Sequence, residues 1–367
     1  MKFRVNRETL LELLQLTTSV VERKQTQPVL ANLLLEVSEQ SLSLTGTDQE
    51  VELRVRTTDV DCEQAGEVTL PGRKLLDITR YLPQEADLTF ALADDRVTLD
   101  SGEFSSQLAT LPVIEFPTMD AVAASVVFEM PVAALGDLVD KTAFAMASQD
   151  VRYFFNGMLF QCLGDELRAV ATNGQRLALS SVREVDCGAG AQFIVPRKGV
   201  SELQRLLQSS GEGVVSLGFS ESTLAVTTPA ATLVTRLIDA DYPDYERAIP
   251  DTTNKVLEGE RKALHDALVR ASILSNEVYK NVRLEMDADG VRIHANNPLQ
   301  EQAKERVSMH YEGSALEIGF NVNYLIETLA VMQGDRIRLS LSDANSACLL
   351  TDPDDINSRY VISPMML

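Results

Sequence analysis

Four pairs and one triplet of aspartate occur along this chain of 367 residues, and paired carboxylates can hold Mg²⁺ for phosphoryl chemistry. The groups are Asp59 and Asp61, Asp94 and Asp95, Asp239 and Asp241, Asp287 and Asp289, and Asp352, Asp354 and Asp355. Each group lies in a loop-like segment with no basic partner alongside. This setting favours solvated turns over a metal site.

Other catalytic signatures are missing from the sequence. It has no Walker A motif, no GxGxxG after a strand, no HExxH and no GxSxG. The three histidines all lie in the last third of the chain, and the four cysteines are scattered with no CxxC pair, which fits a reducing compartment. We therefore expect no catalytic residues, no metal and no cofactor, and a metal-dependent enzyme that uses an aspartate cluster remains the rival interpretation.

The sequence that would form the elements around any site is repeated three times along the chain. Asn32, Asn156 and Asn281 each open a similar phrase (NLLL, NGML and NVRL), and they stand 124 and 125 residues apart. A second phrase returns in step, since the residues from Pro71 to Leu82 match those from Pro196 to Leu207 at an offset of 125. Tandem units of this size are domains rather than solenoid turns.

Each unit reads as an α+β domain with two helices and mostly antiparallel strands. Apolar periodicity predicts an opening helix over 7–23, 132–146 and 261–275, and a second helix beginning near Arg73, Arg197 and Asn321. Alternating polarity predicts strands over 42–48, 86–92, 167–173, 214–219 and 336–341. We place the domains at 1–125, 126–253 and 254–367.

The amino terminus mixes charges into its apolar positions. The stretch MKFRVNRETLLELL contains no continuous hydrophobic run, so we expect neither a secretion signal nor a membrane span, and a cytoplasmic protein.

The net charge of −21 is unevenly distributed. The six helix windows (7–24, 70–83, 131–148, 195–208, 261–277 and 320–333) contain 13 Lys+Arg against 10 Asp+Glu, whereas the remainder contains 20 against 44. If the helices face a common axis, a weakly positive lining that accepts duplex phosphates lies inside a negative shell. The alternative is that these are ordinary solvated helix faces.

Longer strings make a specific resemblance. They are QDVRYFFNGMLF (149–160), ATNGQRLA (171–178), IVPRKGVSEL (194–203), YPDY (242–245), ILSNE (273–277), EIGFNVNY (317–324) and the tail YVISPMML. Together they resemble the bacterial sliding clamp, the β subunit of DNA polymerase III, and the resemblance runs from Met1 to Leu367.

That resemblance implies a ring-forming, head-to-tail homodimer of three clamp-type domains per subunit, in which twelve helices line a hole threaded by duplex DNA. The protein would be a processivity factor that tethers the polymerase without catalysis. Its implied partners are double-stranded DNA, bound without regard to sequence, the DNA polymerase III α subunit, the clamp loader, and other polymerases and repair proteins. No membrane is involved.

The resemblance also implies a set of DNA-facing side chains. They are Arg23, Lys24, Arg73, Gln149, Arg152, Tyr153, Arg197, Lys198 and Arg205. The alternative for each is a solvated surface side chain.

A pocket for short partner peptides is implied between the second and third domains. Its matching positions are Arg152, Phe154, Phe155, Thr172, Gly174, Gln175, Arg176, Leu177, Pro243, Arg247, Val361, Ile362, Ser363, Pro364, Met365 and Met366. Many relatives have histidine in place of Gln175, aspartate in place of Asn173 and a basic residue in place of Met366. We expect the pocket to survive these changes with an altered peptide preference.

The implied dimer contact joins the first domain of one subunit to the third domain of the other. Its residues are Lys74, Arg96, Glu103 and Leu108 on one side, and Ile273, Leu274, Glu301, Lys304 and Glu305 on the other. Relatives have a basic residue at the position of Glu103 and an acidic one at that of Lys304. Both signs are reversed here, so we expect a swapped ion pair.

Two rival functions remain open from the sequence: the metal-dependent enzyme, which turnover with Mg²⁺ would reveal, and a peptide-binding scaffold with no DNA role, which would not stay on circular DNA.

Overall fold

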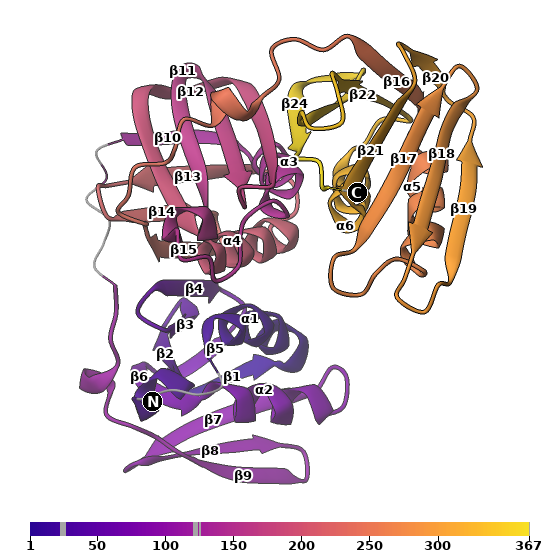
Figure 1. The fold of residues 1–367 in the computed structure, drawn as a ribbon. Helices are drawn as coiled ribbons and strands as arrows, with labels where there is room; N and C mark the ends of the chain where they lie inside the picture. The colour runs from indigo at the N-terminus through magenta and orange to yellow at the C-terminus, as the bar shows by residue number, and fades with distance from the viewer. Residues whose placement is uncertain (23–26, 120–123, 125, 367) are drawn as a thin grey trace. The chain divides into compact units, whose positions relative to one another are not determined.

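The computed structural model describes residues 1–22, 27–119, 124 and 126–366. Contacts divide the chain into two compact units. Unit 1 comprises Met1–Gly136 and Lys198–Leu237, and unit 2 comprises Asp137–Arg197 and Ile238–Leu367. Each unit contains antiparallel sheets with helices packed against them (Figure 1).

Unit 1 contains a five-stranded sheet, in the order β5-β1-β7-β8-β9, and an eight-stranded sheet, in the order β10-β13-β14-β15-β4-β3-β2-β6. The strands are β1 (Lys2–Asn6), β2 (Asn32–Ser38), β3 (Ser41–Thr47), β4 (Val51–Thr57), β5 (Asp61–Gln64), β6 (Gly66–Pro71), β7 (Asp87–Ala93), β8 (Arg96–Ser101), β9 (Phe104–Ala109), β10 (Val126–Pro131), β13 (Val214–Phe219), β14 (Thr223–Thr227) and β15 (Ala231–Arg236). Antiparallel pairing of β15 with β4 places Leu233 opposite Leu53 and joins the first and second repeats in one sheet.

Unit 2 contains a seven-stranded sheet, in the order β11-β12-β24-β23-β22-β16-β20, and a four-stranded sheet, in the order β19-β18-β17-β21. The strands are β11 (Gly157–Thr172), β12 (Arg176–Pro196), β16 (Lys255–Glu260), β17 (Asn281–Asp287), β18 (Gly290–Asn296), β19 (Gln302–Val307), β20 (His310–Glu312), β21 (Leu316–Asn321), β22 (Arg336–Leu341), β23 (Cys348–Asp352) and β24 (Asp355–Ile362). Here β12 pairs with β24, so strands of the second and third repeats share a sheet.

The helices begin where the sequence predicts. They are α1 (Arg7–Val20), α2 (Gly72–Tyr81), α3 (Val132–Ala143), α4 (Arg197–Ser209), α5 (Arg261–Ser272) and α6 (Val322–Val331). Short 3₁₀ turns are η1 (Pro28–Ala31), η2 (Val113–Glu115), η3 (Tyr153–Asn156) and η4 (Tyr245–Ala248). The Asn6 side chain accepts the Glu8 backbone N–H at 3.0 Å and so caps α1, and Asn321 caps α6 in the same way.

Burial follows the predicted apolar stripes. Leu10, Leu13 and Leu14 of α1 are buried, and α1 packs against α2, β3 and β4 within unit 1. Phe3 and Phe90 stack at 4.7 Å between neighbouring strands of the five-stranded sheet. The contacts of α1 with β3 and β4 bury its single apolar face, and its contacts with α2 hold the two helices together.

The α+β interpretation with a helix pair in each repeat is confirmed for the described residues. Each of the three repeated asparagine phrases opens a strand, because β2 and β17 begin at Asn32 and Asn281 and β11 begins directly after Asn156. The middle repeat differs in having two long strands, β11 of 16 residues and β12 of 21. The two compact units cut across that repeat because its strands pair with both neighbours, and the predicted boundary at residue 125 lies outside the described residues.

Within the described part of the chain, no helix is long and apolar enough to cross a membrane.

Candidate nucleic-acid and peptide interfaces

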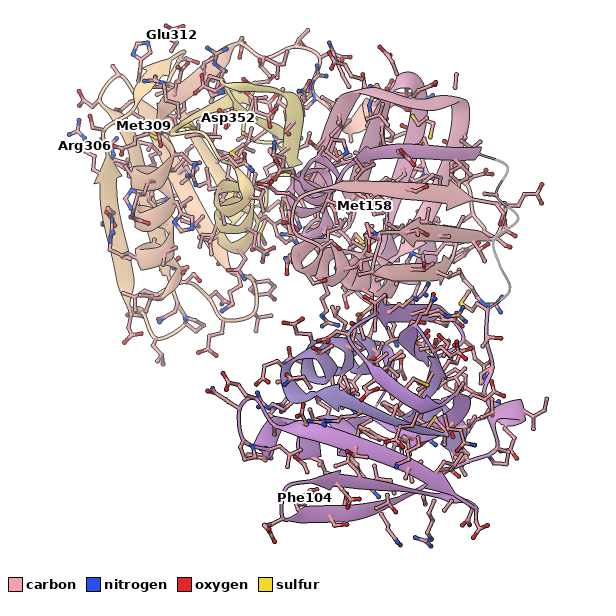
Figure 2. The ribbon with its side chains drawn as sticks, turned by 180° about the vertical axis from the view of Figure 1, so that it is seen from behind. Phe104, Met158, Arg306, Met309, Glu312 and Asp352 are labelled. Atoms are coloured by element: carbon pink, nitrogen blue, oxygen red, sulfur yellow. The ribbon has the colours of Figure 1, made fainter. Side chains whose placement is uncertain are left out.

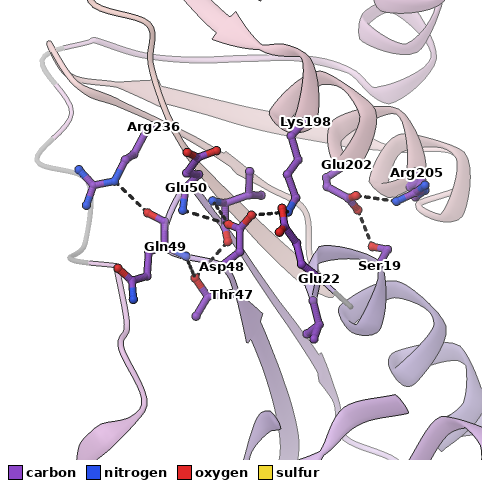
Figure 3. A network of polar contacts seen from close by, with 12 residues as sticks. Ser19, Glu22, Thr47, Asp48, Gln49, Glu50, Lys198, Glu202, Arg205 and Arg236 are labelled. Atoms are coloured by element: carbon purple, nitrogen blue, oxygen red, sulfur yellow. Dashed lines mark hydrogen bonds and ion pairs between the residues drawn. The ribbon is translucent and has the colours of Figure 1, made fainter. Parts of the chain in front are cut away.

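Lys198, at the start of α4, is held by two carboxylates of unit 1 (Figure 3). Its Nζ lies 3.0 Å from Glu22 Oε1 and also contacts Asp48 Oδ2. Asp48 is almost fully buried, and its Oδ1 accepts the backbone N–H groups of Glu50 and Val51 at 3.0 and 2.8 Å. Burial lowers the pKa of Lys198, but hydrogen bonds to the two carboxylates outweigh it, so that pKa lies above its ordinary value.

Arg205, about two turns further along α4, is also paired within unit 1. Its Nη1 lies 2.5 Å from Glu202 Oε1, and the Glu202 carboxylate is 3% exposed. Ser19 of α1 donates its hydroxyl to the other carboxylate oxygen (Figure 3). Two of the cations expected to face DNA are therefore neutralised by acids that also tie α4 to α1.

Arg73 and Arg197 lie in the first turns of α2 and α4 and make similar contacts. Arg73 Nη2 donates to the backbone carbonyl of Val21, directly after α1, at 2.8 Å. Arg197 donates to the carbonyls of Met146 and Ala147, after α3, at 2.6 and 3.0 Å. Both arginines thus satisfy carbonyls that follow an opening helix and have no helical partner. Arg23 and Lys24 lie outside the described residues.

The loop before β11 presents a more open basic surface. Arg152 Nε and Nη2 donate to the two carboxylate oxygens of Asp150 at 3.0 and 2.9 Å, and this pairing lowers the pKa of Asp150 to about 2. Asn156 ties the loop, because its side chain accepts the Asp150 backbone N–H at 2.9 Å and donates to the Asp150 carbonyl at 2.8 Å. Gln149 and Tyr153 are exposed on the same loop.

Three of the expected pocket residues, Phe154, Leu177 and Val361, belong to or pack against a hydrophobic cluster of unit 2. Pairing of β12 with β24 places Leu177 opposite Val361. The buried members of the cluster are Leu159, Val170, Leu177, Leu179, Ile194, Tyr245 and Val361. Phe154 and Tyr242 are partly buried and pack against it. The second and third repeats therefore contribute apolar side chains to one hydrophobic cluster.

Three aromatic rings border this cluster. Phe154 meets Phe155 edge-on with centroids 4.6 Å apart, and Tyr242 lies 6.4 Å from Phe154 and 6.2 Å from Phe155. Edge-to-face packing of this kind holds rings in a defined orientation. Burial raises the pKa of Tyr242. Tyr242 and Tyr245 were not among the predicted site residues, although the string YPDY contains both.

The turn between β11 and β12 presents Gln175. Asn173 Oδ1 accepts the backbone N–H groups of Gln175 and Arg176, both at 2.9 Å. Gly174 has a φ of 86°, and a Cβ there would lie 3.1 Å from the Arg152 guanidinium. The asparagine keeps the acceptor that an aspartate would supply to this turn, and its Nδ2 donates to Tyr324 Oη at 3.2 Å.

Arg176 and Thr172 are engaged by other parts of unit 2. The Arg176 guanidinium lies over the rings of Phe144 and Tyr324, at 5.0 and 4.6 Å, and it pairs with Glu327 of α6. Thr172 is buried, with its hydroxyl donating to the Arg176 carbonyl at 2.6 Å. The structure therefore places Arg176 where it anchors β12 to α6.

The carboxyl-terminal tail is bound at two points. The Ser363 N–H donates to the Gln175 carbonyl and the Met365 N–H to the Gly319 carbonyl, both at 2.8 Å. Met365 is half-buried, whereas Met366 is 96% exposed. Pro243 and Arg247 are exposed, Pro364 is half-buried, and Ile362 is buried.

Most of the predicted dimer residues lie on or beside β9 and β19, the terminal strands of their sheets, whereas Lys74 lies in α2 and Ile273 and Leu274 directly follow α5. Figure 2 shows Phe104 at the start of β9 and Arg306 near the end of β19. Lys74, Arg96, Glu103, Glu301, Lys304 and the 75% exposed Ile273 face solvent, and Leu274 is half-buried. Leu108 is 7% exposed, so it has little surface to offer, and Glu305 pairs with Arg270 in the same protomer.

Two of the five aspartate groups satisfy turns, and both also pair with a basic side chain, Asp287 with Arg292 at 2.7 Å and Asp355 with Lys141 at 2.8 Å. Asp287 accepts the Asp289 N–H at 2.9 Å, and the buried Asp352 (Figure 2) accepts the N–H groups of Gly334 and Asp354 at 2.8 and 2.9 Å. Among the described residues, no three His, Cys, Asp or Glu side chains are grouped so that they could hold a metal ion.

Sequence models of the DNA polymerase III β subunit match nearly the whole chain in three parts. The N-terminal domain matches residues 1–120, the central domain 129–244 and the C-terminal domain 246–366. The chain belongs to the DNA polymerase III β-subunit family. Members of this family are sliding clamps, non-catalytic processivity factors of DNA polymerase III, and the chain has that role.

Individual family members agree along their full length. The β sliding clamp of Pseudomonas putida is 45% identical over 368 residues, which cover all of both chains. A crystal structure of the DNA polymerase III β subunit from Pseudomonas aeruginosa has a TM-score of 0.95 and 43% identity over all of both chains. A second structure of the Pseudomonas aeruginosa clamp, bound to griselimycin, has a TM-score of 0.96 and 44% identity, again over all of both chains.

Proposed function

We propose that two copies of this chain close into a head-to-tail ring around duplex DNA, with three domains per subunit at 1–125, 126–253 and 254–367. The observation that carries the proposal is the match of all three repeats to sliding clamps along the full chain. Retention inside a ring is topological, so a strongly acidic chain can serve DNA without a tight grip on phosphates. A clamp acts on the bacterial chromosome, which lies in the cytoplasm. We therefore propose a cytoplasmic location for the protein.

The dimer contact is proposed to form between β9 of one protomer and β19 of its partner. Both are terminal strands whose outer backbone groups are free to pair, and strand addition of this kind extends a sheet across an interface. Glu103 and Lys304 are exposed and have no ion-pair partner among the described residues. A swapped pair between them would contribute less than about 1 kcal/mol if it stays exposed.

Contact with DNA is proposed for the loop before β11 and the starts of the second helices. Arg152 and Tyr153 support this assignment because both side chains are more than half exposed. Arg73 and Arg197 donate to backbone carbonyls, so they would contribute to the electrostatic field of the lining more than they would bind single phosphates. Lys198 contributes little to that field, because Glu22 and Asp48 neutralise it.

Combined replacement of Arg152, Tyr153, Arg197 and Lys198 tests the lining. We expect weaker clamp loading and weaker retention on primed circular DNA. Because Arg197 and Lys198 also stabilise the fold, the variant must first show wild-type circular dichroism and dimer mass, and the pair Arg152→Ala with Tyr153→Ala serves as a milder version. Unchanged loading by both variants would refute the assignment.

A matched control removes cations from the sheets instead of the lining. Lys2, Arg183 and Arg306 are exposed strand residues, and their replacement by alanine makes a comparable change in net charge. Loading should stay at the wild-type level in this control.

The hydrophobic cluster around Leu177 and Val361 is proposed as the site for peptides of the polymerase α subunit, the clamp loader and other polymerases and repair proteins. Apolar anchors of a short peptide suit a cluster bordered by Phe154 and Tyr242. The exposed thioether of Met366 would adapt to different anchors. Peptide binding that is unaffected by replacement of Leu177 would refute this placement.

A further inference from the structure

A polar cavity of about 360 Å³ lies on the face of the four-stranded sheet that does not carry α5. Its side chains come from β17, β18 and β19, and the strand register arranges them in rows. Arg283 stands opposite His294, and His294 stands opposite Lys304, so three nitrogen-bearing side chains line up across the strands. A cavity of this size is at the lower end of the range for small-molecule sites.

A second row consists of carboxamides. Asn296 stands opposite Gln302, and Asn281 begins β17 beside them. In the described part of the chain, none of these three side chains makes a hydrogen bond to protein, so their donors and acceptors are available to a ligand. The lining includes two alanines and no carboxylate.

The first row provides positive charge. Lys304 has no hydrogen bond or ion pair among the described residues and is exposed. Arg283 is partly engaged, because Glu317 and Glu285 lie 3.1 and 3.3 Å from its guanidinium. Both carboxylates belong to the next row of the sheet, outside the lining, so the side chains that line the cavity are cationic or neutral.

His294 has a ring nitrogen that the fold leaves unsatisfied. Both nitrogens are buried; Nε2 lies 3.2 Å from Glu285 Oε2, whereas Nδ1 has no hydrogen-bond partner among the described residues. Buried polar groups are normally paired, and an unpaired one within a site is a sign of a missing partner.

This cavity is separate from the peptide cluster, but it shares Lys304 with the proposed dimer contact. The peptide cluster is built on β12 and β24, whereas the cavity is built on β17 to β19. Strand pairing at the outer edge of β19 would use backbone groups, and the side chains of Gln302 and Lys304 point to the sheet face by the two-residue alternation of a strand.

We propose that this cavity binds a small oxyanion-bearing molecule, a phosphate ester or a carboxylate that also has hydroxyl groups. Lys304 and Arg283 would hold the oxyanion, since ammonium and guanidinium groups form charge-assisted hydrogen bonds with it. Asn281, Asn296 and Gln302 would hold the hydroxyl groups.

Isothermal titration of the full-length dimer, without DNA or loader and at constant ionic strength, tests this proposal. The probes are inorganic phosphate, ribose 5-phosphate and citrate. We expect saturable binding of at least one probe, with ribose 5-phosphate favoured if the ligand is a phosphate ester and citrate if it is a carboxylate.

Matched variants locate the binding. Lys304→Ala and Asn296→Ala should each weaken it at least tenfold, and Asn296 lies away from the β19 edge, so its effect is independent of dimer contacts. Arg306→Ala is the control, because Arg306 is also an exposed cation of β19 but lies outside the lining. Absence of saturable binding for all three probes, or an equal loss with Arg306→Ala, would overturn the proposal.

Discussion

Lys198→Met isolates the contribution of a partly buried ion pair to unit 1. The Lys198 side chain is 25% exposed and the Asp48 side chain 6%, whereas Glu22 is 56% exposed. Methionine keeps most of the aliphatic stem and removes the charge. Asp48 then retains two backbone hydrogen bonds on Oδ1 but loses the ammonium on Oδ2.

The magnitude follows from that burial. Loss of one partner from a buried ion pair costs about 3–5 kcal/mol, whereas an exposed pair is worth about 0–1 kcal/mol. Because Lys198 is a quarter exposed, we expect about 2 kcal/mol from Asp48 and little from Glu22. The raised pKa of Lys198 means that this contribution is fully present below its ordinary value of 10.5 and is lost as pH rises through the raised pKa.

Native-state hydrogen exchange is the suitable assay, because a chain of several domains does not unfold in one step. We expect faster exchange of the amides of Glu50 and Val51, which donate to Asp48. Their opening free energy should fall by about 2 kcal/mol in Lys198→Met, provided that opening breaks the ion pair.

Two further variants make the result decisive. Lys198→Met combined with Asp48→Asn removes both charges and should recover most of the loss, since no carboxylate is left buried without a partner. Lys2→Met breaks the exposed Lys2–Glu63 pair at 2.6 Å and should cost less than about 1 kcal/mol. Equal losses in Lys198→Met and Lys2→Met, or no recovery in the double variant, would refute the reasoning.

Three other predictions test separate surfaces. Val361→Asp puts a carboxylate into the hydrophobic cluster and should weaken binding of a fluorescent clamp-binding peptide at least tenfold. The dimer mass of the variant is the control for folding, and an unaltered peptide affinity would contradict the pocket assignment. Glu103→Lys should raise the dimer dissociation constant, because the new lysine repels Lys304 of the partner subunit. Adding Lys304→Glu should return the dissociation constant to the wild-type value. If the double variant dimerises no more tightly than the single variant, the ion pair is ruled out. Arg152→Ala should raise the Asp150 pKa from about 2 toward its ordinary value of 3.8 in a carboxyl NMR titration, although the backbone N–H of residue 152 stays in place. The stability that Asp150 contributes above pH 3.8, and loses as pH falls through about 2, should therefore decrease; an unshifted titration argues against the pairing.

The helix positions could be predicted from the sequence because their determinants are local. Asn6 and Asn321 cap the helices that follow them, and Pro71 stands at the entry to α2, where the missing N–H costs nothing. The apolar stripe of α1 became its buried face. Each of these signals lies within a few residues of the helix end it determines.

The sheet arrangement could not be predicted in the same way. Pairing of β15 with β4 and of β12 with β24 joins strands separated by well over one hundred residues, and periodicity does not specify a strand's partner. The same alternation is compatible with several short strands or with the long hairpin of β11 and β12.

The site was predictable in part for a related reason. Family strings identified Leu177 and Val361 separately, and the fold then placed them opposite each other. The acids that neutralise Lys198 gave no sequence signal of that role, because Asp48 is 150 residues away and has the neighbours of an ordinary turn aspartate. Counting charges in the helix windows therefore overstated the positive charge available to DNA.

The most direct test of the central claim is loader-dependent retention on circular against linear DNA. A labelled clamp is loaded onto nicked circular DNA, isolated by gel filtration, and followed after the circle is cut at a single site. Topological binding predicts long retention on the circle and rapid loss after cutting, which blocking the free ends should prevent. Equal retention on circular and linear DNA would contradict the account, because a protein held by surface contacts has no reason to leave through an end.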